Sequence, residues 1–200
     1  MEPIGHEGLG RLLDLGENLS TPHIVFSHND LTEATDLESG GSINIGKSFV
    51  LPPKPLGLDS DKAPFLHLSE NIAVLDNAPS LRPQKIVEIA SKFREEAGYS
   101  RLVYAPAVEP ADMPILAYLG VDVFDDLNVE LRSATGWSLD DGTWIKVNTK
   151  TKDLHSRNRE ELEHWILKIR TSIMNGTLRE LVEITSLHNP RVSQILHHST

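Results

Sequence analysis

The 200-residue chain has ordinary proportions for a globular protein, with 39% hydrophobic residues, 24% charged residues and a formal net charge of −10. It contains no cysteine, which excludes disulfides, thiolate metal sites, iron–sulfur clusters and cysteine nucleophiles. The acidic balance argues against a surface that binds nucleic acid on all sides, because phosphate binding needs clustered lysine and arginine. No apolar run approaches the roughly 18 residues of a membrane span, and the first residues, MEPIGHEGLG, lack a secretory signal, so we expect a cytoplasmic protein with no membrane contact.

The first 70 residues predict short strands and irregular chain. Apolar runs at 11–15 and 23–26 flank Gly16-Glu17-Asn18, a pattern typical of a β-hairpin. The segment 28–70 is rich in proline and glycine, and only the strings SINIG and SFVLP predict strands there.

Residues 71–126 predict the core of the fold. The run Ile72–Leu75 is continuously apolar, as in a strand that is buried on both faces. A helix is expected from Pro83 to Gly98, because apolar residues recur there at helical spacing. The segment 101–124 then reads as strand, short helix and strand. Three strands alternating with two helices give a βαβαβ unit, which implies a parallel sheet.

Acidic residues gather where the third strand of this unit should end. They are Asp122, Asp125 and Asp126. The carboxyl ends of parallel strands form the floor of the active site in α/β proteins. We therefore expect these three aspartates to be catalytic candidates. The alternative is that Asp125 and Asp126 only cap a strand end and face solvent.

Residues 127–200 predict a hairpin followed by a helical cap. Asp140-Asp141-Gly142 between two alternating segments is a strong hairpin signal. A long amphipathic helix is expected at 157–175. Thr177–Glu180 has the pattern of a capping box that starts the next helix. Asn189-Pro190 supplies the N-cap and first-turn proline of a last one.

A basic strip follows the acidic segment in the sequence. Residues 143–159 hold five basic side chains and one acid, whereas residues 107–142 hold eight acids and one arginine. We expect the five basic residues of the strip to contact phosphate: Lys146, Lys150, Lys152, Arg157 and Arg159. A solvated surface without a ligand is the alternative.

Three strings resemble the tRNA-guanine transglycosylase superfamily. GRLLDLGENLSTPHIVF at 10–26 is similar to the family's opening strands, and LVYAPAVEPADMPILAYLGVDVFDD at 102–126 is similar to a late barrel strand, helix and strand. GVDVFDD, together with GTLRELVE at 176–183, resembles the archaeosine synthase branch. The resemblance implies an α/β fold, a partial or degenerate TIM-type barrel with a βαβαβ core, an N-terminal β-hairpin and C-terminal helices. It implies one transglycosylase-like domain over 1–200, divided at about residues 70 and 126.

The resemblance also implies roles for single residues. Asp125 falls on the aspartate that attacks the ribose anomeric carbon in the transglycosylases and holds the covalent intermediate, with Asp122 and Asp126 as orienting neighbours. The family's general-acid motif, Asp-Ser-Gly-Gly-Phe, is echoed only by Glu38–Ser42, which we interpret as a loop. Of the family's zinc ligands only His188 has a counterpart, so neither a metal nor a cofactor is expected.

The function implied by the resemblance is tRNA modification in the archaeosine pathway, by acting on or binding a D-loop base, with tRNA as the partner. If the chain is active, it is a transferase. The alternative is a non-catalytic transglycosylase-like subunit that binds a catalytic partner, tRNA or both. A third possibility is that another chain completes the barrel. The residues leave these possibilities open.

Overall fold

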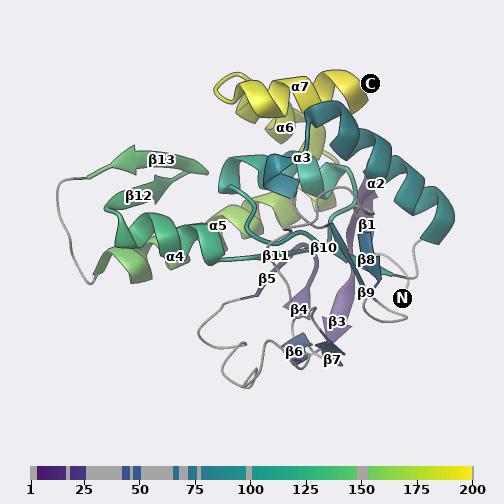
Figure 1. Cartoon of the computed structure of the whole chain (residues 1–200), viewed down its shortest axis with the longest axis horizontal. Helices are drawn as coiled ribbons and strands as arrows, with labels where there is room; N and C mark the ends of the chain where they lie inside the picture. Colours follow the sequence, from purple (N-terminus) through teal and green to yellow (C-terminus); the bar gives the residue numbers. More distant parts are fainter. Residues whose placement is uncertain are drawn as a thin grey trace.

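The fold is known from a computed structural model, which describes nine segments of the chain. These are residues 4–16, 19–25, 42–45, 47–50, 65–67, 72–75, 78–97, 101–147 and 153–199. Figure 1 shows a central sheet with helices stacked on one side and a hairpin extending from one end.

The central sheet has five strands in the order β5–β11–β10–β9–β8. Their bounds are β5 His23–Val25, β11 Val123–Asp125, β10 Leu102–Tyr104, β9 Ile72–Leu75 and β8 Phe65–His67. The first four are mutually parallel, and β8 pairs antiparallel with β9. The residues of β9, β10 and β11 whose burial is described are all buried, as the continuous apolar run predicted for β9. The α/β class and the parallel βαβαβ unit are thereby confirmed.

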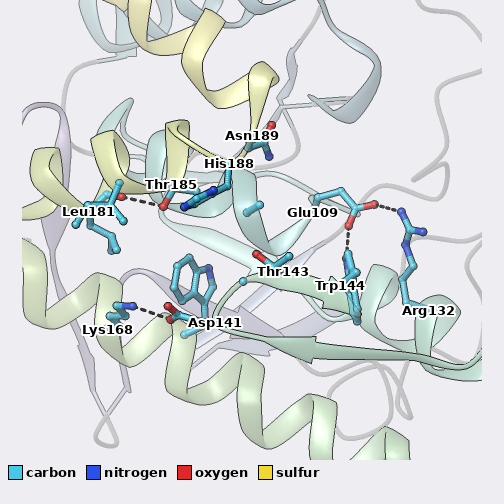
Figure 2. A pocket seen from close by; sticks show the side chains of 14 residues that line it. Glu109, Arg132, Asp141, Thr143, Trp144, Lys168, Leu181, Thr185, His188 and Asn189 are labelled. Atoms are coloured by element: carbon cyan, nitrogen blue, oxygen red, sulfur yellow. Dashed lines mark hydrogen bonds and ion pairs between the residues drawn. The ribbon is translucent and has the colours of Figure 1, made fainter. Parts of the chain in front are cut away.

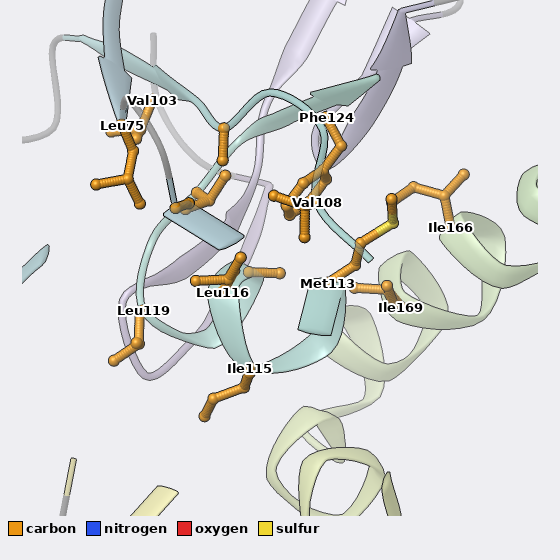
Figure 3. Close-up of a cluster of buried hydrophobic side chains, with 14 of the residues drawn as sticks. Leu75, Val103, Val108, Met113, Ile115, Leu116, Leu119, Phe124, Ile166 and Ile169 are labelled. Carbon is orange, nitrogen blue, oxygen red and sulfur yellow. The ribbon is translucent and has the colours of Figure 1, made fainter. Parts of the chain in front are cut away.

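Helices cover one side of this sheet. In chain order they are the 3₁₀ turn η1 Ala78–Ser80, α2 Pro83–Ala97, the 3₁₀ turn η2 Pro110–Asp112, α3 Met113–Tyr118, α6 Leu178–Ser186 and α7 Pro190–Ser199. The short helix α3 lies between the sheet and the α6–α7 pair (Figure 1). Figure 3 shows its Met113 and Leu116 among side chains from the sheet, such as Phe124, and from helix α5, Asp153–Asn175, such as Ile169.

The longest helix is α5, Asp153–Asn175, which begins four residues before the expected position. It buries the predicted apolar stripe, including Leu162 and Ile169, against the rest of the core. The predicted cap of α7 is also confirmed, because Asn189 Oδ1 accepts the backbone N–H of Arg191 at 3.0 Å.

The predicted hairpin consists of β12, Trp137–Asp140, and β13, Thr143–Lys146. Asp141 and Gly142 both have positive φ, 45° and 78°, as a two-residue turn of the primed type requires. A Cβ at Gly142 would lie 2.7 Å from the Trp165 ring, so glycine is needed there for space as well as for conformation. The two strands predicted at SINIG and SFVLP are confirmed as β6, Ser42–Ile45, and β7, Lys47–Val50, and the structure pairs them antiparallel.

The N-terminal strands pair differently from the prediction. Two hairpins form, β1 Gly5–Glu7 with β2 Gly10–Leu12, and β3 Asp14–Gly16 with β4 Leu19–Ser20. The expected pairing of residues 11–15 with 23–26 is wrong, because β4 is the partner of β3 and β5 joins the central sheet beside β11. The burial of Ile24 and Val25 in that sheet accounts for the difference.

Two further expectations need correction. Helix α4, Leu127–Ala134, was not predicted. The capping box at Thr177 does not form, because its side chain makes no cap hydrogen bond. Instead, the Glu7 carboxylate accepts the backbone N–H groups of Leu178 and Arg179, the latter at 2.9 Å. Glu38–Ser42 lies largely outside the described residues, as does Gly98. In the described part of the chain, none of the helices has the length and apolar character needed to cross a membrane.

Candidate functional site

Asp125 ends β11, and its carboxylate is held by donors from two neighbouring segments. The hydroxyl of Tyr104, at the end of β10, donates to Oδ2 at 2.6 Å. The backbone N–H of Ala107 contacts both oxygens, at 3.0 and 3.1 Å, and that of Leu127 donates to Oδ1 at 3.2 Å. The carboxyl ends of the two adjacent parallel strands β10 and β11 therefore meet at this acid.

The side chain of Asp125 is buried, with 5% of the residue exposed. Burial raises the pKa of Asp125 from 3.8 to about 6, against the opposing effect of the hydrogen bonds from Tyr104, Ala107 and Leu127. Burial also raises the pKa of Tyr104 well above its ordinary value, and the charge of Asp125 adds to that rise. The hydroxyl of Tyr104 is therefore protonated at neutral pH and can donate a hydrogen bond. The pKa of Asp125, about 6, lies near neutral pH.

The connection that holds Asp125 has an unusual backbone. Ala107 has a φ of 53°, a conformation that is uncommon for residues other than glycine. Its carbonyl accepts the amide of Asn128, in α4, at 2.5 Å. The connection after β10 and the helix after β11 are therefore tied together next to the carboxylate.

Asp126 follows the strand and precedes α4. It is fully buried, and its Oδ2 lies 3.4 Å from Nε of Arg159 on α5. One member of the predicted phosphate-binding strip thus pairs with one member of the predicted catalytic cluster. Arg159 holds α5 against the end of the sheet rather than standing apart on the surface.

Asp122 lies at the opposite end of β11 from Asp125, because it precedes the strand. Its two oxygens accept hydrogen bonds from Nε and Nη2 of Arg11, at 2.8 and 3.0 Å. Both side chains are almost completely buried. Asp122 also accepts the backbone N–H of Val103 at 2.8 Å. The Arg11–Asp122 pair joins the segments GRLLDL, 10–15, and GVDVFDD, 120–126. Asp125 and Asp126 lie at the other end of β11.

The other predicted phosphate contacts are distributed as follows. Lys146 and Arg157 are exposed. The ammonium group of Lys146 lies 5.0 Å from the centre of the Trp137 ring and donates to the carbonyl of Thr135 at 2.6 Å. Lys150 and Lys152 lie outside the described residues.

A pocket of about 500 Å³ adjoins the connection after β10, and Asp125 is not among the residues that line it. Its walls come from the connection after β10, α4, the turn and second strand of the β12–β13 hairpin, α5, α6 and the α6–α7 connection (Figure 2). It contains two indoles, Trp144 and Trp165. It also contains His188, the counterpart of a zinc ligand in the superfamily that the sequence resembles. The polar groups Glu109 and Lys168 also line it.

The sequence reasoning missed this pocket as a site. Its walls are separated by up to 80 positions in the chain, from Glu109 to Asn189, so no local spacing could have indicated it. The only signal in the sequence was Trp144 itself, a large aromatic residue in the strand that follows Asp140-Asp141-Gly142.

The comparisons with known proteins agree with the resemblance described above. No model of a protein family matches the chain. The chain is 31% identical over 121 residues to an archaeosine synthase of Methanocaldococcus jannaschii, covering 60% of this chain and 21% of that protein. It is 26% identical over 163 residues to an archaeosine synthase subunit alpha of Thermoplasma acidophilum, covering 78% of this chain and 31% of that protein. The chain thus matches only between a fifth and a third of the length of these relatives. It is, by sequence, a relative of the archaeosine synthases.

Proposed function

We propose that this chain takes part in tRNA modification in the archaeosine pathway, as a transglycosylase-like component that acts on or binds a base of the tRNA D-loop. The observation that carries the proposal is the sequence match to two archaeosine synthases over 60% and 78% of the chain.

We further propose that the chain forms one transglycosylase-like domain, built as part of a TIM-type barrel. The strand order supports this, because β9, β10 and β11 are neighbours in chain order and β5 pairs in parallel with β11. In a closed barrel the first and last parallel strands are neighbours in the same way. The sheet as described ends at the antiparallel strand β8, so closure would need further strands from this chain or from a partner.

Two modes of action follow for Asp125. In the catalytic mode its carboxylate attacks the anomeric carbon of the ribose, the bond from ribose to base breaks, and the base leaves with the bonding electrons and takes up a proton. In the non-catalytic mode the chain binds tRNA and a catalytic partner. The geometry favours the second mode for the chain by itself, because both oxygens of Asp125 accept hydrogen bonds and only 5% of the residue is exposed.

The two modes differ in one measurement. The chain is incubated with tRNA, denatured, and examined for an adduct that survives denaturation. An adduct that Asp125→Asn abolishes establishes the catalytic mode. If no adduct forms, but tRNA affinity falls when Lys150 and Lys152 are replaced by glutamine, the binding mode holds. A chain that neither forms an adduct nor binds tRNA contradicts the proposed function as a whole.

A further inference from the structure

Ala107, in the connection after β10, has both of its backbone polar groups held by side chains. Its N–H donates to Asp125 of β11, at 3.0 and 3.1 Å from the two carboxylate oxygens. Its carbonyl accepts the amide of Asn128 on α4 at 2.5 Å. Both contacts are made at a φ of 53°, which is unfavourable for a residue with a side chain. The two side chains therefore stabilise a backbone conformation that alanine by itself does not favour.

The conformation of Ala107 determines where Glu109 lies, two residues further along the chain. Glu109 lines the pocket, whereas Ala107, Asp125 and Asn128 are not among the lining residues. The backbone of Glu109 is extended, with φ −65° and ψ 137°. Because φ and ψ are the only soft dihedrals of the chain, a change of φ at Ala107 rotates everything that follows it. If Ala107 left the left-handed region, Glu109 would move away from its present contacts.

Those contacts leave little tolerance for such a movement. Oε1 of Glu109 accepts Nη2 of Arg132 at 2.8 Å, and Oε2 accepts the ring N–H of Trp144 at 2.7 Å. Figure 2 shows both contacts at the side of the pocket. A donor and an acceptor more than about 3.5 Å apart no longer form a hydrogen bond. A displacement of Glu109 by about 1 Å is therefore enough to break either contact.

Helix α4 holds the connection at two points. Asn128 binds the backbone of Ala107, and Arg132 binds the side chain of Glu109. These two residues of α4 are four positions apart, so they lie on the same face of the helix. The connection is fixed again beyond Glu109, because Trp165 of α5 donates to the carbonyl of Pro110 at 2.8 Å.

We infer that Asp125 and Asn128 are positioning residues for the pocket. Together they hold Ala107 in its left-handed conformation and so keep the carboxylate of Glu109 in the pocket wall. The inference goes beyond the proposed function, because it concerns the free chain and needs no tRNA. It also gives the carboxylate of Asp125 a role that does not involve attack on a ribose.

The test follows the ring N–H of Trp144 by nuclear magnetic resonance of the free chain. Trp144→Phe identifies its signal among those of the three tryptophans. Asp125→Ala and Asn128→Ala should each speed hydrogen exchange of this N–H about 10-fold or more, the factor expected when a hydrogen bond to a charged group is lost. Thr135→Ala, an exposed position at the end of α4, is the matched control and should leave the rate unchanged.

The conservative variant Asp125→Asn separates positioning from a general loss of stability. Its amide oxygen can still accept the N–H of Ala107, so the exchange rate of the Trp144 ring N–H should stay at the wild-type value. Asp140→Ala removes an exposed acid from the hairpin that carries Trp144. This variant should also keep the wild-type rate, because Asp140 does not belong to the connection.

A pH titration adds a readout that depends on the charge of Asp125. The chemical shifts of the Ala107 amide and of the Trp144 ring N–H should show a common step near pH 6, where Asp125 titrates. Asp125→Asn should abolish this step in both signals. This comparison is needed because other titrating groups are close by.

In the described part of the chain, the ionisable groups next to Asp125 are Tyr104 and Asp126, and Arg159 lies beside Asp126. All three remain in Asp125→Asn, and so does Glu109, which contacts the reporter directly. A step that this variant loses therefore arises from residue 125.

Faster exchange in both alanine variants, with the wild-type rate in Asp125→Asn and in the controls, supports the inference. Wild-type exchange in both alanine variants overturns it, provided that circular dichroism shows them folded. If Asp125→Ala does not fold, Asn128→Ala and the pH step decide the question. None of these measurements uses tRNA. A chain that keeps this coupling but neither binds tRNA nor forms an adduct with it contradicts the proposed function alone.

Discussion

Replacement of Asp125 by asparagine is expected to stabilise the protein at neutral pH. An ionised carboxylate at this buried position lacks a paired cation among its hydrogen-bond donors, which are one hydroxyl and two backbone N–H groups. Asparagine fits the same contacts. Its amide oxygen can accept the N–H groups of Ala107 and Leu127, and its amide nitrogen can donate to the oxygen of Tyr104.

The magnitude follows from the pKa of the acid. Burial raises the pKa of Asp125 from 3.8 to about 6, and each unit corresponds to about 1.4 kcal/mol. The protonated form of Asp125 is thus favoured in the folded state by about 3 kcal/mol relative to the unfolded state. That contribution is fully present below pH 4, because the acid is then protonated in both states. It is lost as the pH rises from about 4 to about 6, because the unfolded chain releases its proton first.

The assay is urea denaturation of wild type and Asp125→Asn at unit steps from pH 4 to pH 8. The difference in the free energy of unfolding, variant minus wild type, should rise by about 3 kcal/mol between pH 4 and pH 7 and then level off. Other titrating groups are common to both proteins and cancel in this difference. Asp140→Asn, an exposed acid of the hairpin, controls for the loss of one negative charge.

A difference that stays constant across this pH range would refute the reasoning, and so would a variant that becomes relatively less stable as the pH rises. Either result would mean that the folded protein stabilises the charge of Asp125. The hydrogen bonds from Tyr104 and the backbone would then outweigh burial.

Three other substitutions test the packing. Arg11→Met should lower the free energy of unfolding by roughly 3–5 kcal/mol in urea denaturation, because it leaves a buried carboxylate without its cation. Gly142→Ala should be more destabilising than Gly176→Ala by about 1–3 kcal/mol in thermal melts, because both have positive φ but only the first would press a Cβ against the ring of Trp165. Glu7→Ala should cost about 0.5–2 kcal/mol as a lost helix cap and should speed hydrogen exchange of the two amides that begin α6.

The parts of the fold that follow from local pattern were predictable. The strands β9 and β10 and the helix α2 follow from apolar runs and helical spacing, and the β12–β13 turn follows from Asp-Gly. Helix α4 was missed because its eight residues bury only Val129 and Ser133, too few for a recognisable period. The partner of β5 was missed because pairing between distant parallel strands leaves no local signal.

The candidate site was predictable only in part, for the same reason. The sequence indicated that acids lie near the end of β11, but not which of them share an environment. Asp122 pairs with Arg11, which lies 111 positions away, and Asp126 lies beside Arg159 on α5. The pocket combines five separated segments, so neither its shape nor the contact between Glu109 and Trp144 could be read from spacing.

Asp122 and Asp125 differ in the groups that surround their carboxylates. Three positions apart on the same segment, both are nearly inaccessible to solvent. Asp122 has the guanidinium of Arg11 against both oxygens, so its charge is balanced in place and its role is to join two parts of the chain. The hydrogen-bond donors to Asp125 are all neutral, and its pKa of about 6 lies close to neutral pH. A buried acid that costs stability when ionised is typical of functional sites. If Asp125→Asn proves more stable at pH 7 and yet impairs the handling of tRNA, folding alone does not explain the carboxylate at this position.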